Sequence, residues 1–151
     1  MSESWTIKIA DWNQLPETFL DGNWKQAKVA SSEKISIPKK SGIYMYCIAV
    51  PNAKNLKLKK LNTPIYMGIA KNLRERFVDH LRPEDSLYES RKCYGSNMNF
   101  FFLVIEPYIK EEFRVLYEQP MIDCFGKVVN KIDSVGKDNP IRGNVKTFKR
   151  L

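Results

Sequence analysis

The longest uninterrupted apolar stretches of this chain are short, and their length limits the folds open to it. One covers residues 43–50 and another residues 100–105. A helix that crosses a membrane needs about 20 apolar residues, so we expect no membrane span. Apolar stretches of about four to eight residues, rich in β-branched and aromatic side chains, are typical of buried strands. The chain is therefore predicted to fold around a sheet.

An apolar period of a helix lies between the two apolar stretches, within residues 71–82. Leu73, Phe77 and Leu81 recur every four residues and predict one apolar helix face within 71–82. Asn72 can cap the first turn by accepting hydrogen bonds from its free amides. This segment is therefore predicted to pack one face on the sheet.

The remaining elements give a mixed order of strands and helices. Strands are predicted over 43–50, 64–69 and 98–105, and a second helix over about 110–125. Pro120 must kink or split that helix, because proline removes a backbone donor and collides with the preceding turn. The order β–β–α–β–α predicts an α/β fold: a small α/β sandwich with a central, mainly antiparallel three-stranded sheet flanked by helices.

Charge and length suggest how the 151 residues are organised. We expect an N-terminal arm over 1–37 that packs on or leads into the core, a main domain over 38–132 and a basic C-terminal tail over 133–151. The arm has four lysines and five acidic residues, so the net charge of +8 comes from the rest of the chain. Such a surplus favours a polyanionic partner.

The cysteines and the N-terminus indicate a cellular compartment. The three cysteines are widely spaced and form no C-x-x-C pair, which argues against a disulfide framework and against a cysteine zinc site. The start Met-Ser-Glu-Ser-Trp has neither the basic residues nor the apolar core of a signal peptide. We therefore expect a cytoplasmic protein that does not contact membranes.

The two first strands and the helix after them carry the most specific pattern. Ser-Gly-Ile-Tyr ends at Tyr44, and Ile-Tyr-Met-Gly contains Tyr66. The helix then carries Arg76, ten residues after Tyr66, and His80 four residues further. This pattern resembles the GIY-YIG nuclease family over residues 41–130. The resemblance implies that Arg76 is the catalytic arginine and that His80 is the histidine of several branches.

The resemblance extends to two later residues. Glu118, within Leu-Tyr-Glu-Gln-Pro-Met-Ile, matches the family's metal-binding glutamate, and Asn130 matches its closing asparagine. The sequence departs from the family pattern at Met67, in the second motif. It also departs in the gap of 21 residues between the two tyrosines, which contains a lysine-rich insertion like that of restriction-enzyme-like branches.

The resemblance implies a divalent-metal-dependent endonuclease that hydrolyses DNA phosphodiester bonds, with RNA as the alternative substrate. Glu118 is the only family-matched carboxylate, so we expect a one-metal site for Mg²⁺, which Mn²⁺ could replace. Tyr44 would take the proton from water, with Tyr66 and His80 as orienting or relay groups, and Asn130 would position a neighbour by hydrogen bonds.

Basic side chains near the motifs are expected to follow the phosphate backbone of the nucleic acid. These residues are Lys54, Lys57, Lys59, Lys60, Lys71, Arg74 and Arg82. Two alternatives to a self-sufficient enzyme remain at this point: a catalytically idle nucleic-acid-binding module, and a nuclease subunit that needs a separate targeting partner. Cleavage of palindromic sites would imply a homodimer.

Overall fold

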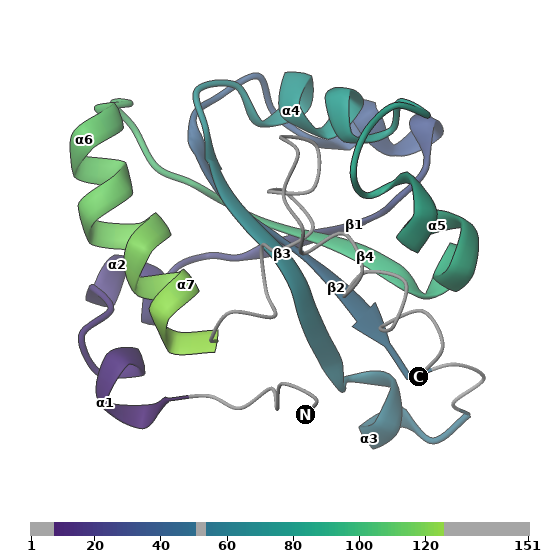
Figure 1. Ribbon diagram of the computed structural model, residues 1–151, viewed down its shortest axis with the longest axis horizontal. Helices are drawn as coiled ribbons and strands as arrows, with labels where there is room; N and C mark the ends of the chain where they lie inside the picture. The colour runs from purple at the N-terminus through teal and green to yellow at the C-terminus, as the bar shows by residue number, and fades with distance from the viewer. Residues whose placement is uncertain (1–7, 51–53, 126–151) are drawn as a thin grey trace.

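The computed structural model describes residues 8–50 and 54–125, which form an α/β structure around one sheet (Figure 1). The sheet has four strands in the order β1-β4-β2-β3, and every neighbouring pair is antiparallel. The strands are β1 (Lys25–Lys28), β2 (Gly42–Ala49), β3 (Asn62–Ala70) and β4 (Met98–Val104). The three strands predicted from apolar stretches are therefore β2, β3 and β4, and β4 lies in the interior of the sheet as its apolar sequence requires.

The prediction of a three-stranded sheet was wrong by one strand. Strand β1, from the segment expected to be an arm, pairs with β4 through the register Ala27↔Phe100. Only Ala27 of its four residues is buried, because β1 is a short strand at the edge of the sheet. A four-residue polar segment carries no local strand pattern, so only its pairing with β4 reveals it.

Short helices connect the strands and cover both faces of the sheet. They are α1 (Ile9–Trp12), α2 (Glu17–Leu20), α3 (Leu56–Lys59), α4 (Leu73–His80), α5 (Tyr88–Tyr94), α6 (Lys110–Phe113) and α7 (Gln119–Phe125). Two 3-10 segments lie at Ser31–Ser36 and Gly95–Asn97. None of the helices within residues 8–50 and 54–125 has the length and apolarity that a bilayer crossing requires.

The predicted second helix is divided by a π segment, Arg114–Glu118, between α6 and α7. Pro120 follows this segment directly. An α-helix would need the amide that proline lacks, to bond the carbonyl four residues earlier. The wider π turn is rare, and it occurs mostly as a single turn within an α-helix that continues on both sides. The predicted disruption at Pro120 therefore takes this form.

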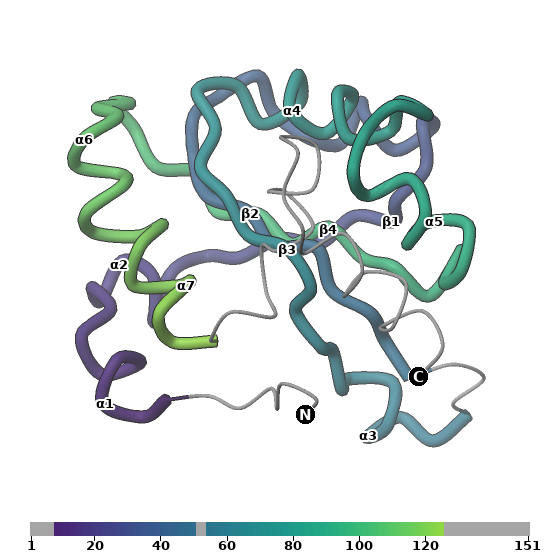
Figure 2. Tube along the Cα trace, viewed as in Figure 1, coloured from purple at the N-terminus to yellow at the C-terminus, as the bar shows by residue number. Residues whose placement is uncertain are grey.

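Figures 1 and 2 show helices on both faces of the sheet, and a separate apolar layer lies between the sheet and the helices on each face. On one face, α4 and the Ser31–Ser36 segment pack with Tyr44, Tyr66 and Phe100 of the sheet. On the other face, α1, α2, α6 and α7 pack over Ile43 and Met67. Alternate residues of β2 thus enter opposite layers, as strand geometry dictates.

Candidate active site

The glycine of the second motif is required by the position of Tyr44. Gly68 lies directly opposite Tyr44 in the β2–β3 pair. A Cβ atom on Gly68 would lie 2.5 Å from the Tyr44 hydroxyl oxygen and 2.7 Å from Cζ. Only a residue without a side chain therefore lets the Tyr44 ring lie across the neighbouring strand.

The glycine of the first motif is required by its neighbours in the same way. Gly42 faces β3 on one side and β4 on the other, through Ala70 and Val104. A Cβ atom there would overlap the Leu103 carbonyl oxygen and lie 2.9 Å from Leu73 Cδ1. The close packing of α4 against the first motif thus depends on this glycine.

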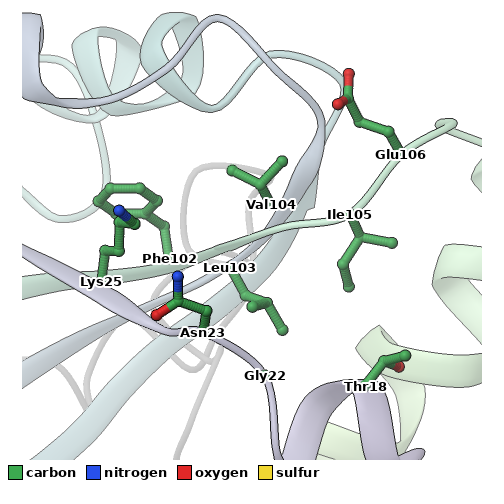
Figure 3. Close-up of a pocket in the computed structure, with 9 residues that line it drawn as sticks. All are labelled: Thr18, Gly22, Asn23, Lys25, Phe102, Leu103, Val104, Ile105 and Glu106. Carbon is green, nitrogen blue, oxygen red and sulfur yellow. The ribbon is translucent and has the colours of Figure 1, made fainter.

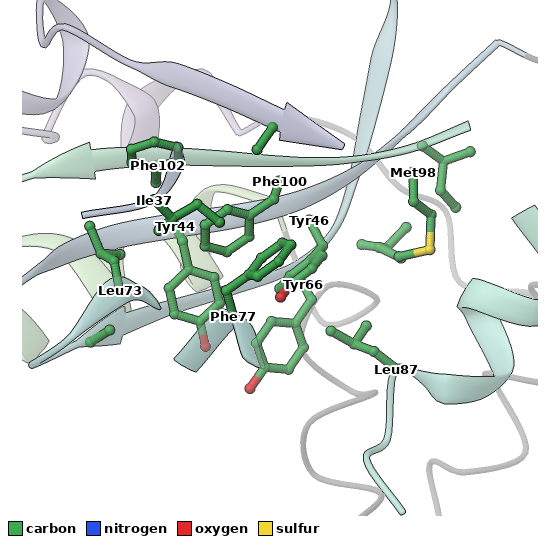
Figure 4. Packing of buried hydrophobic residues seen from close by; sticks show 14 residues of the cluster. Ile37, Tyr44, Tyr46, Tyr66, Leu73, Phe77, Leu87, Met98, Phe100 and Phe102 are labelled. Carbon is green, nitrogen blue, oxygen red and sulfur yellow. The ribbon is translucent and has the colours of Figure 1, made fainter. Parts of the chain in front are cut away.

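Tyr44 and Tyr66 belong to a buried aromatic group on the α4 face of the sheet (Figure 4). Their rings stack with centroids 6.0 Å apart, and their hydroxyls point to the same side. Phe100 of β4 stacks on Tyr44 at 5.5 Å, and Tyr46 meets it edge-on at 5.9 Å. Tyr44 is 1% exposed, so these contacts hold its ring in one orientation.

Helix α4 brings His80 against the two tyrosines. The Asn72 side chain accepts a hydrogen bond from the Glu75 amide at 3.1 Å, which caps the first turn as predicted. Leu73 and Phe77 are fully buried one turn apart, and they set the rotation of the helix. His80 is on the same buried face, at 4% exposure, with its ring centroid 5.0 Å from that of Tyr66.

A chain of hydrogen bonds connects β2, α4 and the loop after α4. The Tyr44 hydroxyl lies 3.0 Å from His80 Nε2. On the other side of the ring, His80 Nδ1 lies 3.1 Å from both carboxylate oxygens of Asp85. Asp85 in turn accepts a hydrogen bond from the Leu87 amide at 2.9 Å. The pKa of Asp85 is lowered: burial raises it, but the hydrogen bond and the charge interaction with His80 and the Leu87 amide outweigh burial.

Arg76 is the exposed member of this group. It lies one helical turn before His80, and it forms a hydrogen bond with Tyr44. Partial desolvation lowers its pKa, but the interactions with Tyr44, Tyr66 and Asp79 outweigh desolvation, so its pKa is raised. A permanent positive charge therefore lies beside the buried tyrosines and faces solvent.

A cleft of about 410 Å³ opens on the outer side of Arg76. Lys71 and Asn72 at the start of α4 line it, together with Glu75, Arg76 and Asp79. Two cations, Lys71 and Arg76, and two acids, Glu75 and Asp79, line this cleft, so its formal charges balance and Arg76 is the group in it that hydrogen-bonds Tyr44.

Two predicted phosphate-binding arginines have protein partners. Arg74 donates from Nε to the Ile37 carbonyl at 2.7 Å and from Nη2 to the Ile35 carbonyl at 3.2 Å. These bonds attach α4 to the loop before β2. Arg82 pairs with Asp79 at 3.3 Å, and both side chains are exposed. Arg82 can exchange this partner for a phosphate at low cost, because exposed ion pairs stabilise a protein by less than about 1 kcal/mol.

The predicted lysines of the insertion are exposed at some distance from this cleft. Lys57 and Lys59 are in α3, and Lys54 and Lys60 flank that helix. Figure 2 shows α3 at one end of the β2–β3 pair, whereas α4 begins at the other end. A nucleic acid that touches both basic groups must therefore extend along the strands.

Glu118 belongs to a different segment from the hydrogen-bonded group, one that packs on the other face of the sheet. It is half-buried at the end of the π segment, which contacts β3, and the adjacent Tyr117 enters the apolar layer on the face opposite Tyr66. Within residues 8–50 and 54–125, no cluster of three or more His, Cys, Asp or Glu could hold a metal ion. A single carboxylate fits only a cation such as Mg²⁺ that keeps most of its water ligands. Asn130 lies outside the described residues.

A separate pocket of about 480 Å³ lies beside the end of β4 (Figure 3). Its polar side chains are those of Thr18, Asn23, Lys25 and Glu106, and Phe102 and Leu103 are among its apolar ones. None of the predicted site residues lines this pocket. Tyr44, Tyr66 and His80 lie in or against the apolar layer on the α4 face, and they do not line this pocket.

Sequence reasoning missed one member of the site, Asp85. Pro83 ends the helical pattern, and the residues after it match no motif that singles out one acid over its neighbour Glu84. A usable signal was the turn itself, because an aspartate that accepts from the amide two residues later is common where a helix gives way to a turn. The structure adds Asp85 to Tyr44, Tyr66, Arg76 and His80.

Known proteins offer no guide to the function of this chain, so the geometry of the site is the basis for a proposal. No protein-family model, no curated protein and no solved structure matched the chain.

Proposed function

We propose that this protein is a divalent-metal-dependent nuclease of the GIY-YIG type that hydrolyses phosphodiester bonds in DNA. The observation that carries the proposal is the joint position of Tyr44, His80 and Arg76. The Tyr44 hydroxyl lies 3.0 Å from His80 Nε2 and also bonds the exposed Arg76. A group that can lose a proton, a group that can accept it and a fixed cation thus meet at one point.

Arg76 suits the phosphate of the substrate. Its planar guanidinium can donate two hydrogen bonds to phosphate oxygens, whose negative charge grows as a nucleophile attacks. Lys71, on the same cleft, adds a second positive charge for the neighbouring backbone. Removing one such donor from an active site typically costs about 3–4 kcal/mol of transition-state stabilisation.

Tyr44 and His80 suit the removal of a proton from water. A free phenol has a pKa near 10, so it is a weak base unless its proton can leave in the same step. His80 Nε2 is at hydrogen-bond distance from the Tyr44 oxygen and can take that proton. Tyr66, stacked on Tyr44, orients its ring.

Glu118 is the residue that would hold a Mg²⁺ ion. When bound, this cation would relieve charge on the phosphate and on the leaving oxygen. Because the protein offers one carboxylate, we expect weak binding of the ion until substrate phosphate supplies further oxygen ligands. The reaction should therefore need millimolar rather than micromolar metal.

Supercoiled plasmid incubated with the protein and Mg²⁺, or with EDTA, tests this proposal. We expect nicked and linear products with Mg²⁺ only, and Glu118→Ala should abolish them. Glu112→Ala is the matched control, since it removes an exposed carboxylate from the same helical stretch. An absence of cleavage with Mg²⁺ and Mn²⁺ would refute a self-sufficient nuclease, and equal cleavage by Glu118→Ala would refute the metal assignment.

Binding of DNA is a separate readout. If Lys71, Arg82 and the lysines around α3 contact phosphates, the association constant should fall steeply as salt rises, because each neutralised phosphate releases counterions. A fluorescently labelled duplex titrated at two salt concentrations measures this slope. An association constant independent of salt would contradict the assignment of these residues.

A further inference from the structure

We infer that Asp85 is a positioning residue that holds His80 as the tautomer with its proton on Nδ1, so that Nε2 is free to accept the proton of Tyr44. This inference rests on the proposed nuclease function and deepens it. It adds a third member to the Tyr44–His80 pair, from a loop that the family resemblance does not assign.

The hydrogen-bond geometry determines which nitrogen carries the proton. An ionised carboxylate only accepts hydrogen bonds, and both oxygens of Asp85 lie 3.1 Å from His80 Nδ1. The Leu87 amide also donates to Asp85, at 2.9 Å, which favours the ionised form of the carboxylate. Nδ1 must therefore be the donor. In a neutral imidazole the other nitrogen, Nε2, is then an acceptor, and it faces the Tyr44 hydroxyl at 3.0 Å.

Burial makes this arrangement stable. His80 is 4% exposed, and the Asp85 side chain is 19% exposed, so water competes little for the bond between them. The His80 ring is also enclosed by Tyr46 at 5.3 Å and by Tyr66 at 5.0 Å. These contacts keep the ring in the orientation in which Nε2 faces Tyr44.

The other polar and charged groups around His80 either favour the same tautomer or do not affect it. The groups that face His80 or its hydrogen-bond partners are Tyr44, Tyr46, Tyr66, Asp85, Arg76 and Arg91. Arg91 of α5 interacts with the charge of Asp85 and donates to the Leu81 carbonyl at 2.7 Å. Within residues 8–50 and 54–125, Asp85 is thus the anion that meets a positive charge on His80.

The proposed step balances in protons and electrons. A water oxygen forms a bond to phosphorus while one of its protons passes to the Tyr44 oxygen, and the Tyr44 proton passes to His80 Nε2. The bond from phosphorus to the leaving oxygen breaks, and that oxygen keeps the electron pair and takes a proton from solvent. Asp85 stabilises the imidazolium that results, as a buried carboxylate does for a histidine base. The imidazolium then returns its proton to solvent.

The chain contains a single histidine, so a spectrum can test the tautomer directly. Protein labelled with ¹⁵N in the histidine ring, with any affinity tag removed, gives one set of ring signals. At a pH where the imidazole is neutral, we expect a proton bonded to Nδ1 and none on Nε2. A proton on Nε2, or a mixture of tautomers in fast exchange, would overturn the inference. This measurement needs neither DNA nor activity.

A matched pair of variants tests the role in catalysis. Asp85→Asn should lower kcat for plasmid nicking by about 10²–10⁴-fold, with KM little changed, because an amide can bond Nδ1 in either tautomer and does not stabilise an imidazolium. Glu84→Gln removes one negative charge from the adjacent exposed residue and should alter kcat by less than about twofold.

The outcomes separate the two proposals. An Nδ1 proton in the spectrum with no plasmid cleavage would refute a self-sufficient nuclease and support the tautomer. Cleavage by Asp85→Asn at the rate of the wild type would overturn the role of Asp85 while leaving the nuclease function intact. If Asp85→Asn does not fold, the spectrum of the wild-type protein still decides the tautomer.

Discussion

Replacing Gly68 by alanine tests whether the β2–β3 pair is built around the Tyr44 ring. The added methyl group would lie 2.5 Å from the Tyr44 hydroxyl oxygen, 2.7 Å from Cζ and 3.0 Å from Cε1. The ring has no room to retreat, since Phe100 and Tyr66 stack on it at 5.5 and 6.0 Å. The variant must therefore displace Tyr44 or separate the strands.

The cost follows from these contacts. Overpacking a core costs about 1–3 kcal/mol. Loss of the bond between Tyr44 and His80 adds about 0.5–1.5 kcal/mol. Alanine also restricts the unfolded chain more than glycine does, which contributes about 0.4–1 kcal/mol in the opposite direction. The free energy of unfolding should therefore fall by about 0.5–4 kcal/mol.

Urea denaturation followed by circular dichroism measures this change. A double-mutant cycle with Tyr44→Phe provides the control, because the phenylalanine lacks the oxygen that the methyl group meets first. Gly68→Ala should cost about 1 kcal/mol less in the Tyr44→Phe background than in the wild type. If Gly68→Ala stabilises the protein, or if its cost is the same in both backgrounds, the account of this glycine is wrong.

Three further predictions concern buried groups. Tyr46→Phe should raise the free energy of unfolding, measured by urea denaturation, by about 1 kcal/mol. The Tyr46 hydroxyl is buried without a hydrogen-bond partner in the part of the chain described, so its removal relieves a desolvation cost. A loss of stability would instead show that the hydroxyl has a partner. At pH 8 a thiol reagent should modify the exposed Cys93 before the other two cysteines, as mass spectrometry would detect. Cys124 is buried, and burial raises the pKa of Cys47 to about 12. Labelling of Cys47 as fast as that of Cys93 would contradict its burial. The pKa of Asp85 is lowered in the folded state, so its ionised form stabilises the fold above its ordinary value of 3.8 and this stability is lost as pH falls further. Asp85→Asn should therefore flatten the acid limb of a stability–pH curve, and an unchanged slope would argue against the bond to His80.

The sequence was sufficient to predict the elements with a strong local pattern. The apolar stretch at 43–50 corresponds to β2, and Asn72 caps α4 as its position suggested. Buried strands and helix caps depend on residues that are close in sequence, so short windows contain the signal. The existence of a helix across Pro120 was also predictable, although its π geometry was not.

Features that depend on distant pairing could not be predicted in this way. Strand β1 pairs Lys28 with Asn99, far along the chain, and its own four residues have no apolar alternation. Asp85 joins the site only because the turn after α4 folds back towards His80. A motif can assign residues that a family shares, but an acid in a connecting loop is recognised only from its hydrogen bonds.

The part of the site that the structure brings together is the part that lies on neighbouring elements. Tyr44 and Tyr66 are on adjacent strands, and one helix carries both Arg76 and His80. Glu118 comes from a helix on the other face of the sheet, so its distance from the group depends on the whole sandwich rather than on local spacing.

The rate at which Arg76→Ala nicks supercoiled plasmid in Mg²⁺, under single-turnover conditions, tests the nuclease proposal most directly. We expect a loss of at least about 10²-fold, because a cation aimed at the phosphate is removed while the buried Tyr44–His80–Asp85 chain is left in place. Lys110→Ala, which removes an exposed positive charge from α6, should nick at nearly the rate of the wild type. Nicking by Arg76→Ala at the wild-type rate would contradict the account, since the cation beside the tyrosines would then have no part in the reaction.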